Sequence, residues 1–237
     1  MNETIDLINK FEKFTKSEIA SAIKELDGIK IESNRKHLQR LVYVNLVNRF
    51  DSFVDTLLLS FSIKESEFQK KVLNDTKEEP VFLKDIYEIF LSENSRTEVE
   101  NRVQGVVRSN YLNQRHSSKL RILLKECFNW SDSDWQRPRV FINNGSIFFD
   151  VTRIKPHKIP DTVIGYADWL YSRRNALVHH DKPEITKNDV KYIEEKFLTK
   201  LSKSFSLKIS SIGSASKFYL DLTESLKKQI SSLKNEI

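Results

Sequence analysis

The chain has 237 residues, of which 39% are hydrophobic and 30% are charged, so it can bury a core and is not expected to be disordered throughout. Five Gly and five Pro make up about 4% of the chain, against about 12% in an average protein. This shortage argues against an all-β sandwich or a Rossmann-type fold and favours long helices. The net charge of +6 suits either a polyanionic partner such as RNA or a solvated basic surface.

The first part of the chain has the apolar spacing of helices. A first helix is predicted over Ile5 to Leu26, ended by Asp27-Gly28, and a central helix follows from about Asn34 to Ile63. Apolar residues cover most of the central helix and leave one narrow polar strip, formed by Asn45, Arg49, Ser52 and Thr56. The strip is either a solvent-facing edge or one wall of a site.

The middle of the chain is also predicted to be helical. A short helix is expected over Ser66 to Leu73, then an apolar element over Val81 to Leu91, and a longer helical stretch over Ser95 to Phe128 that Gly105 interrupts weakly. The last stretch carries scattered basic residues, namely Arg108, Arg115, Lys119, Arg121 and Lys125. They form either a phosphate-tracking surface or an ordinary charged face.

One β signal interrupts the helices. Val140-Phe141-Ile142 and Ile147-Phe148-Phe149 flank Asn143-Asn144-Gly145-Ser146, and Asn-Gly is the preferred pair for a type I′ turn. Pairing across such a turn places Phe141 opposite Phe148. Because a lone hairpin is marginal in water, we predict a small hairpin insertion at about residues 139–151 that packs on the helices.

Helices are predicted again after Pro156 and Pro160. One runs from about Thr162 to Val178, and another begins at the capping sequence Thr186-Lys187-Asn188-Asp189. A C-terminal helical extension over about residues 202–237 is indicated by the spacing of Phe218, Leu222, Leu226 and Ile230. The fold class predicted from these elements is all-α, as a single helical domain over residues 1–237 with the hairpin inserted.

The cysteine content and the lengths of the apolar runs indicate in which cellular compartment the protein lies. The single Cys127 excludes a disulfide scaffold and a thiolate zinc cluster, and it fits a reducing environment. The first six residues are acidic where a signal peptide is basic, and no apolar run reaches the roughly 18 residues of a membrane span. We therefore expect a soluble, cytoplasmic protein with no membrane association.

The residues most able to take part in catalysis or ligand binding lie in one segment, Tyr171 to Asp181. On a helical wheel Arg174 falls among apolar positions, namely Val163, Ala167, Leu170, Leu177 and Val178. A guanidinium stays charged at neutral pH and is costly to bury unpaired. Arg174 must therefore meet a carboxylate, a cleft or a second subunit, either as half of a structural ion pair or as an anion-binding group.

His179 follows where Asp181-Lys182-Pro183 should end the helix, since residues before proline avoid the helical region. Imidazole moves protons readily near neutral pH. A histidine that moves protons and an arginine that holds phosphate can suffice for RNA cleavage by 2′-hydroxyl attack on the adjacent phosphorus, with charge stabilised electrostatically. No metal or other cofactor is expected for such a reaction.

Arg174-Asn175-Ala176-Leu177-Val178-His179 resembles the Arg-x(4–6)-His motif of the HEPN superfamily, in which Asn or Asp often follows the arginine. Members are helical bundles, many of them metal-independent endoribonucleases of toxin–antitoxin, abortive-infection and CRISPR-associated systems, and the chain is most similar in character to stand-alone RiboL-PSP-like types. The resemblance implies catalytic Arg174, His179 and Asn175, with secondary roles for His180 and Arg173. It also implies RNA as substrate, a homodimer whose two motifs share one cleft, and an antitoxin or regulatory protein as partner.

Several points stay open at this stage. Arg174 and His179 lie about 140° apart on an ideal helix, whereas Arg173 and His180 lie about 20° apart, so a helix end near Val178 or a second subunit is needed for the first pair. His180 either assists or serves as a cation at the helix end, and Asn175 either orients the His179 ring or bonds the backbone. Asp181 stands where related toxins carry a tyrosine that is modified to inactivate them, so that regulation is not implied. Two other functions are a non-catalytic helical module that binds RNA or protein, and a purely structural bundle.

Overall fold

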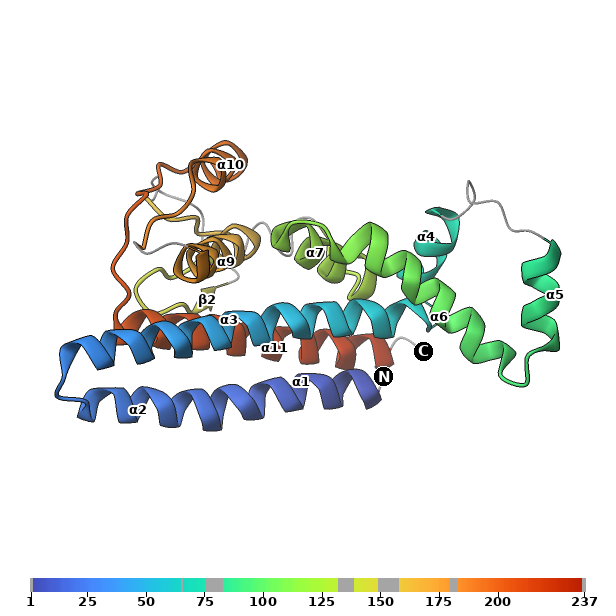
Figure 1. Cartoon of the computed structure of the whole chain (residues 1–237), viewed down its shortest axis with the longest axis horizontal. Coiled ribbons are helices and arrows are strands. Elements are labelled where there is room, and N and C mark those ends of the chain that lie inside the picture. The colour runs from blue at the N-terminus through green and yellow to red at the C-terminus, as the bar shows by residue number, and fades with distance from the viewer. Residues whose placement is uncertain are drawn as a thin grey trace. The chain divides into compact units, whose positions relative to one another are not determined.

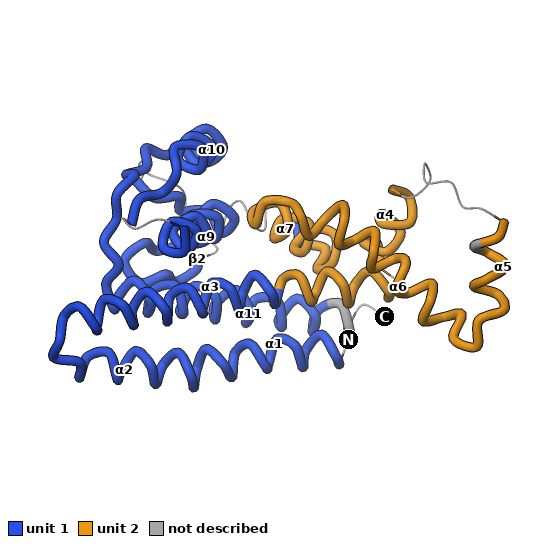
Figure 2. Tube along the Cα trace, in the orientation of Figure 1, with its two compact units in different colours: residues 1–53, 130–237 blue, residues 54–129 orange. Residues whose placement is uncertain are grey.

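The computed structural model describes residues 2–64, 66–75, 83–131, 139–148, 158–179 and 183–235. It confirms an all-α fold with a small antiparallel hairpin. The chain divides into two compact units, one formed by residues 1–53 with 130–237 and the other by residues 54–129 (Figure 2). This division does not test whether residues 1–237 form a single domain, which remains a prediction. Within the described residues, no helix combines the length and the apolar character needed to span a bilayer.

Three helical stretches run side by side in the first unit (Figure 1). The first comprises α1 (Asn2–Phe14), a π-helical turn (Thr15–Ile19) and α2 (Ala20–Gly28), which together match the predicted first helix. The others are α3 (Glu32–Ser62) and α11 (Ile209–Asn235). Aromatic rings join them, since the ring centroid of Phe50 lies 4.0 Å from that of Tyr219 and 5.5 Å from that of Phe11. This aromatic layer fixes α3 and α11 against each other, as expected from their apolar spacing.

Helix α9 (Val163–His179) packs on α3 and carries the predicted motif. It is buried on every side over Val163–Leu170, and the hydroxyl of Tyr43 on α3 donates to the carbonyl of Leu170 at 3.0 Å. Gly165 permits close packing of the following helix, α10 (Lys187–Phe197), because a Cβ at residue 165 would lie 2.9 Å from the Phe197 ring. The predicted cap of α10 is confirmed, with Thr186 Oγ1 accepting from the Asp189 amide at 3.1 Å.

The hairpin pairs β1 (Arg139–Val140) with β2 (Ile147–Phe148) in antiparallel register, with Val140 opposite Ile147. The predicted type I′ turn does not form. Such a turn needs a positive φ at both central residues, and Asn144 does not have one, since Asn129 and Leu198 are the only described non-glycine residues with positive φ. The loop instead spans residues 142–145, and Gly145 takes φ +79° while donating to the Phe141 carbonyl at 2.7 Å. The predicted pairing of Phe141 with Phe148 is also wrong, because Arg139 stands opposite Phe148, but the two rings still meet diagonally with centroids 5.8 Å apart. Residues 149–151 of the predicted insertion lie outside the described residues.

The second unit contains the end of α3 with α4 (Glu67–Asp75), α5 (Leu83–Leu91), α6 (Ser95–Val107) and α7 (His116–Ile122). Two π-helical turns, Arg108–Leu112 and Leu123–Cys127, follow α6 and α7. The break in the long helical stretch falls at residues 113–115 rather than at Gly105, which lies inside α6. Lys119 is buried and its Nζ lies 2.7 Å from Asp55 Oδ1, so this basic residue stabilises the unit instead of facing a polyanion.

Candidate functional site

Arg174 lies half-buried on α9 and is held by neutral groups. Its Nε donates to the side-chain oxygen of Asn48 on α3, and its Nη1 donates to Asn175 Oδ1 at 2.8 Å. The guanidinium carbon lies 5.4 Å from the ring centroid of Tyr171. Within the described part of the chain, no carboxylate forms an ion pair with Arg174. Two amide oxygens therefore orient the guanidinium, and no carboxylate among the described residues neutralises it, which is the arrangement expected of an arginine that receives an anion.

The predicted core position of Arg174 is wrong, and the arginine in the core is Arg173. Arg173 is 3% exposed, whereas Arg174 is only partly buried and Val178, assigned to the same apolar face, is 43% exposed. The wheel fails here because the first half of α9 is buried all round, so its apolar residues do not mark a single face. Two polar residues of the same helix, Asp168 and Ser172, are also buried.

Asn175 is bonded to Arg174 in the structure. Its side-chain oxygen accepts from Arg174 Nη1, so the amide holds the guanidinium, which neither of the two roles predicted for it included. A bond between adjacent side chains on one helix leaves no sequence signal beyond the Arg-Asn pair itself. Asn48, the second amide that holds Arg174, was not predicted, because it is not part of the polar strip identified on the central helix. The residues of that strip are exposed, as expected of a solvent-facing edge, namely Asn45, Arg49, Ser52 and Thr56.

His179 is the last residue of α9 and is exposed. The helix was predicted to end near Val178, and α9 reaches one residue further, to His179. No hydrogen bond joins His179 to Arg174 in the described part of this single chain. His180, the alternative histidine, lies outside the described residues, so the structure does not choose between the two predicted pairs.

A basic groove of about 460 Å³ lies beside the same helix. The first turns of α3 supply three cationic or titratable side chains, Lys36, His37 and Arg40, and Leu177 of α9 and Pro183 line the groove as well. Sequence reasoning missed it, although the run from Arg35 to Arg40 is a visible concentration of basic residues. A groove of this charge suits a phosphate backbone.

The comparisons with known proteins give no family. No protein-family model, no curated protein and no solved structure matches the chain. The HEPN resemblance stays a prediction that rests on the residues from Arg174 to His179. Among the described residues, no three or more His, Cys, Asp or Glu side chains gather in a way that could hold a metal ion.

Proposed function

We propose that the protein is an endoribonuclease that cleaves RNA without a metal ion, with Arg174 and His179 as its catalytic residues. The observation that carries the proposal is the neutral support of Arg174. An arginine that merely stabilises a fold is usually paired with a carboxylate, whereas here two amide oxygens orient the guanidinium and leave its charge available. The exposed histidine at the end of the same helix supplies a group that can move protons.

The reaction follows from these two groups. His179 accepts the proton of a ribose 2′-hydroxyl, and the 2′-oxygen attacks the adjacent phosphorus. Arg174 binds the non-bridging oxygens and stabilises the charge that grows on them. The bond from phosphorus to the 5′-oxygen breaks, the leaving oxygen takes up a proton from a protonated imidazole or from water, and the products are a 2′,3′-cyclic phosphate and a 5′-hydroxyl. Each proton and electron pair is accounted for without a cofactor.

A homodimer would allow Arg174 and His179 of different subunits to act together. Because no hydrogen bond joins Arg174 to His179 within one chain, we propose that the motifs of two subunits face each other in one cleft, as the HEPN resemblance implies. The basic groove at Lys36, His37 and Arg40 would then hold RNA backbone that leads to the cleft. The same resemblance supports a role as a toxin or an anti-phage effector, restrained by an antitoxin or regulatory protein.

The test is incubation of purified protein with bulk RNA in EDTA. We expect cleavage by the wild type and at least about a hundredfold less by Arg174→Ala and by His179→Ala, since each removes one group required in the transition state. Both side chains are at least partly exposed, so both variants should keep the thermal unfolding midpoint of the wild type within a few degrees. Unchanged cleavage by both variants would place the activity elsewhere.

A second candidate is a non-catalytic module that binds RNA through the basic groove. It is favoured by the lack of an Arg174–His179 hydrogen bond and by the cationic lining of the groove. The same assay separates the two, because the module binds RNA with a strong salt dependence and releases it intact.

A further inference from the structure

A second anion-binding feature lies apart from the Arg174 motif, in a cavity of about 270 Å³. The cavity lies where the hairpin loop, α9 and the beginning of α11 meet. Its polar lining comes from Asn143, Arg173, Ser206, Ser210, Ser211 and Ser214, and the rings of Tyr166, Trp169 and Phe205 complete the wall. None of the described residues that line the cavity is acidic.

Arg173 is the cation of this cavity. Its side chain is 3% exposed, and its guanidinium carbon lies 4.6 Å from the ring centroid of Trp169 and 4.5 Å from that of Phe205. Nη2 donates to the Ser206 carbonyl at 3.2 Å, whereas Nε is buried without a hydrogen-bond partner. Because Trp169, Phe205 and Ser206 all line the cavity, the guanidinium lies at its wall.

The charge of Arg173 has no counterion in the described part of the chain. Cation–π contacts and one carbonyl compensate a buried guanidinium only in part. A carboxylate would be expected beside a purely structural arginine at this depth, yet the cavity offers hydroxyls and an amide. An unpartnered buried donor next to an open polar cavity is explained most simply by a ligand that carries negative charge.

The beginning of α11 adds a second, independent attraction for anions. The first N–H groups of a helix have no partner within the helix, and the helix dipole favours negative charge there. Ser210 and Ser211 lie in the first turn of this helix, which continues to Asn235. The turn is held in place, since the Lys208 amide donates to Ser211 Oγ at 3.3 Å and the Ser211 amide donates to the Lys208 carbonyl at 2.9 Å.

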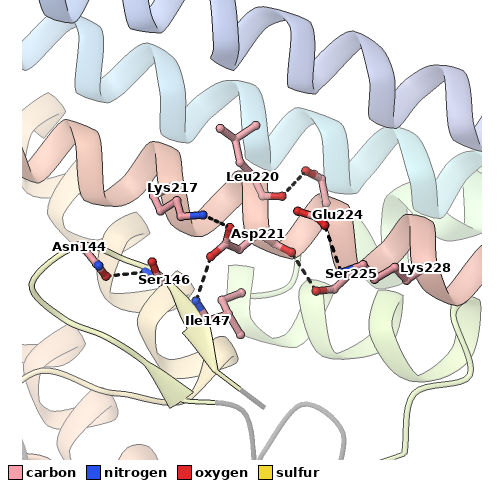
Figure 3. A network of polar contacts seen from close by, with 10 residues as sticks. Asn144, Ser146, Ile147, Lys217, Leu220, Asp221, Glu224, Ser225 and Lys228 are labelled. Atoms are coloured by element: carbon pink, nitrogen blue, oxygen red, sulfur yellow. Dashed lines mark hydrogen bonds and ion pairs between the residues drawn. The ribbon is translucent and has the colours of Figure 1, made fainter. Parts of the chain in front are cut away.

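Hydrogen bonds also hold the hairpin against α11, and the hairpin loop forms the remaining wall of the cavity. The backbone amide of Ile147 donates to Asp221 Oδ2 at 3.1 Å, and Lys217 Nζ donates to Asp221 Oδ1 at 2.6 Å; Figure 3 marks both contacts. Nearer the cavity, Ser214 Oγ lies 3.2 Å from the Asn143 carbonyl and 3.0 Å from the Ser210 carbonyl, so its one proton is shared between the hairpin loop and α11. These bonds place Asn143 at the cavity against the first turns of α11 before any ligand arrives, which lowers the cost of binding.

We propose that this cavity binds the phosphate group of a small phosphomonoester. Arg173 supplies a charged donor, the positive end of the α11 dipole attracts the anion, and the Ser206 and Ser210 hydroxyls can donate to its oxygens. The site does not depend on the proposed nuclease activity, because it uses neither Arg174 nor His179. It would serve as a place where a phosphorylated metabolite stabilises the packing of α9, α11 and the hairpin.

The test is a titration of ¹⁵N-labelled full-length protein with inorganic phosphate and, in parallel, with adenosine monophosphate and adenosine at constant ionic strength. We expect saturable amide shifts at Ser206, Ser210 and Ser211 with phosphate and with the monophosphate, and none with adenosine. Ser210→Asp places a carboxylate at the exposed mouth of the cavity, so it should weaken phosphate binding at least about tenfold by like-charge repulsion.

The matched control is Ser232→Asp, the same substitution at an exposed serine near the other end of α11. An acidic residue stabilises the first turn of a helix and destabilises the last. We therefore expect Ser210→Asp to be at least as stable as the wild type yet to bind phosphate at least about tenfold more weakly, and Ser232→Asp to bind phosphate as the wild type does. The proposal is overturned if phosphate shifts none of the three serine amides, or if Ser210→Asp binds phosphate as tightly as Ser232→Asp.

Discussion

Arg174 and Asn48 lie 126 positions apart in the sequence, and the guanidinium of one donates to the side-chain amide of the other. The bond ties α9 to α3 without neutralising the arginine, because an amide oxygen accepts a hydrogen bond and brings no charge. The nuclease proposal depends on this neutrality. Replacing the amide by a carboxylate tests it with almost no change in shape.

Asn48→Asp should keep the fold and reduce RNA cleavage at least about tenfold, because a carboxylate beside Arg174 competes with the scissile phosphate for its charge. The measurement is the initial cleavage rate in EDTA together with the thermal unfolding midpoint. Asn45→Asp is the matched control, since it makes the same change on the exposed side of α3 and should leave the rate within about twofold of the wild type. Equal rates for the two variants would contradict a role for Arg174 in binding phosphate.

Gly145→Ala should destabilise the protein by about 1–3 kcal/mol in urea unfolding. Gly145 has φ +79°, and a Cβ there would overlap the carbonyl of Ser214 on α11. Gly105→Ala provides the contrast, because Gly105 lies inside α6 with nothing within 4 Å of a new Cβ, and it should gain about 0.5–1 kcal/mol. Similar changes of stability for both substitutions would refute the tight packing of the hairpin loop on α11.

Glu12 should make stability depend on pH in the acid range. Burial alone would raise the pKa of this carboxyl, but Lys227 on α11 and Lys16, each at 2.9 Å, outweigh it and hold the pKa below the ordinary value of 4.5. A lowered native pKa gives stability that is present above pH 4.5 and is lost as the pH falls through the native value.

The measurement for Glu12 is the urea midpoint of the wild type and of Glu12→Gln between pH 7 and pH 3. The wild type should be the more stable at pH 7, and the difference should shrink below about pH 4.5. Glu224→Gln is the control, since it removes an exposed pair with Lys228 on the same helix, worth at most about 1 kcal/mol. A difference for Glu12→Gln that stays constant down to pH 3 would be inconsistent with the lowered pKa.

Cys127 should be inert toward thiol reagents in the native protein. Burial raises the pKa of its thiol well above the ordinary value, so both the thiolate fraction and access are low. Reaction with Ellman's reagent at pH 8 should be at least about a hundredfold slower in buffer than in 6 M urea. Comparable rates in the two conditions would show that the second unit exposes this thiol.

The elements of the fold follow from local pattern, and the site does not. Apolar spacing places α3 and α11 because their buried faces are long and regular, and Thr186 caps α10 because one side chain and one nearby amide suffice. The burial of Arg173 depends instead on Trp169 of α9 together with Tyr43 and Phe205, which reach it from two other segments. A wheel drawn on α9 alone lacks Tyr43 and Phe205, so the sequence cannot rank the two neighbouring arginines.

The hairpin likewise follows only in part from its local sequence. Asn144-Gly145 indicates a turn correctly but not its type, since only Gly145 of the two takes a positive φ, at a place where its backbone packs closely against Ser214 of α11. The loop therefore lengthens to four residues, although the aromatic contact of Phe141 with Phe148 survives. Tertiary packing overrides the local preference where the two compete.

The most direct test of the nuclease uses one oligoribonucleotide and its 2′-deoxy counterpart, each incubated with the protein in EDTA. The proposed chemistry requires the 2′-hydroxyl as nucleophile and no metal ion. We expect the RNA to be cut into fragments that end in a 2′,3′-cyclic phosphate, with a 5′-hydroxyl on the other fragment, and we expect the deoxy strand to stay whole. Intact RNA, equal cleavage of both strands, or cleavage that His179→Ala leaves unchanged would contradict the account.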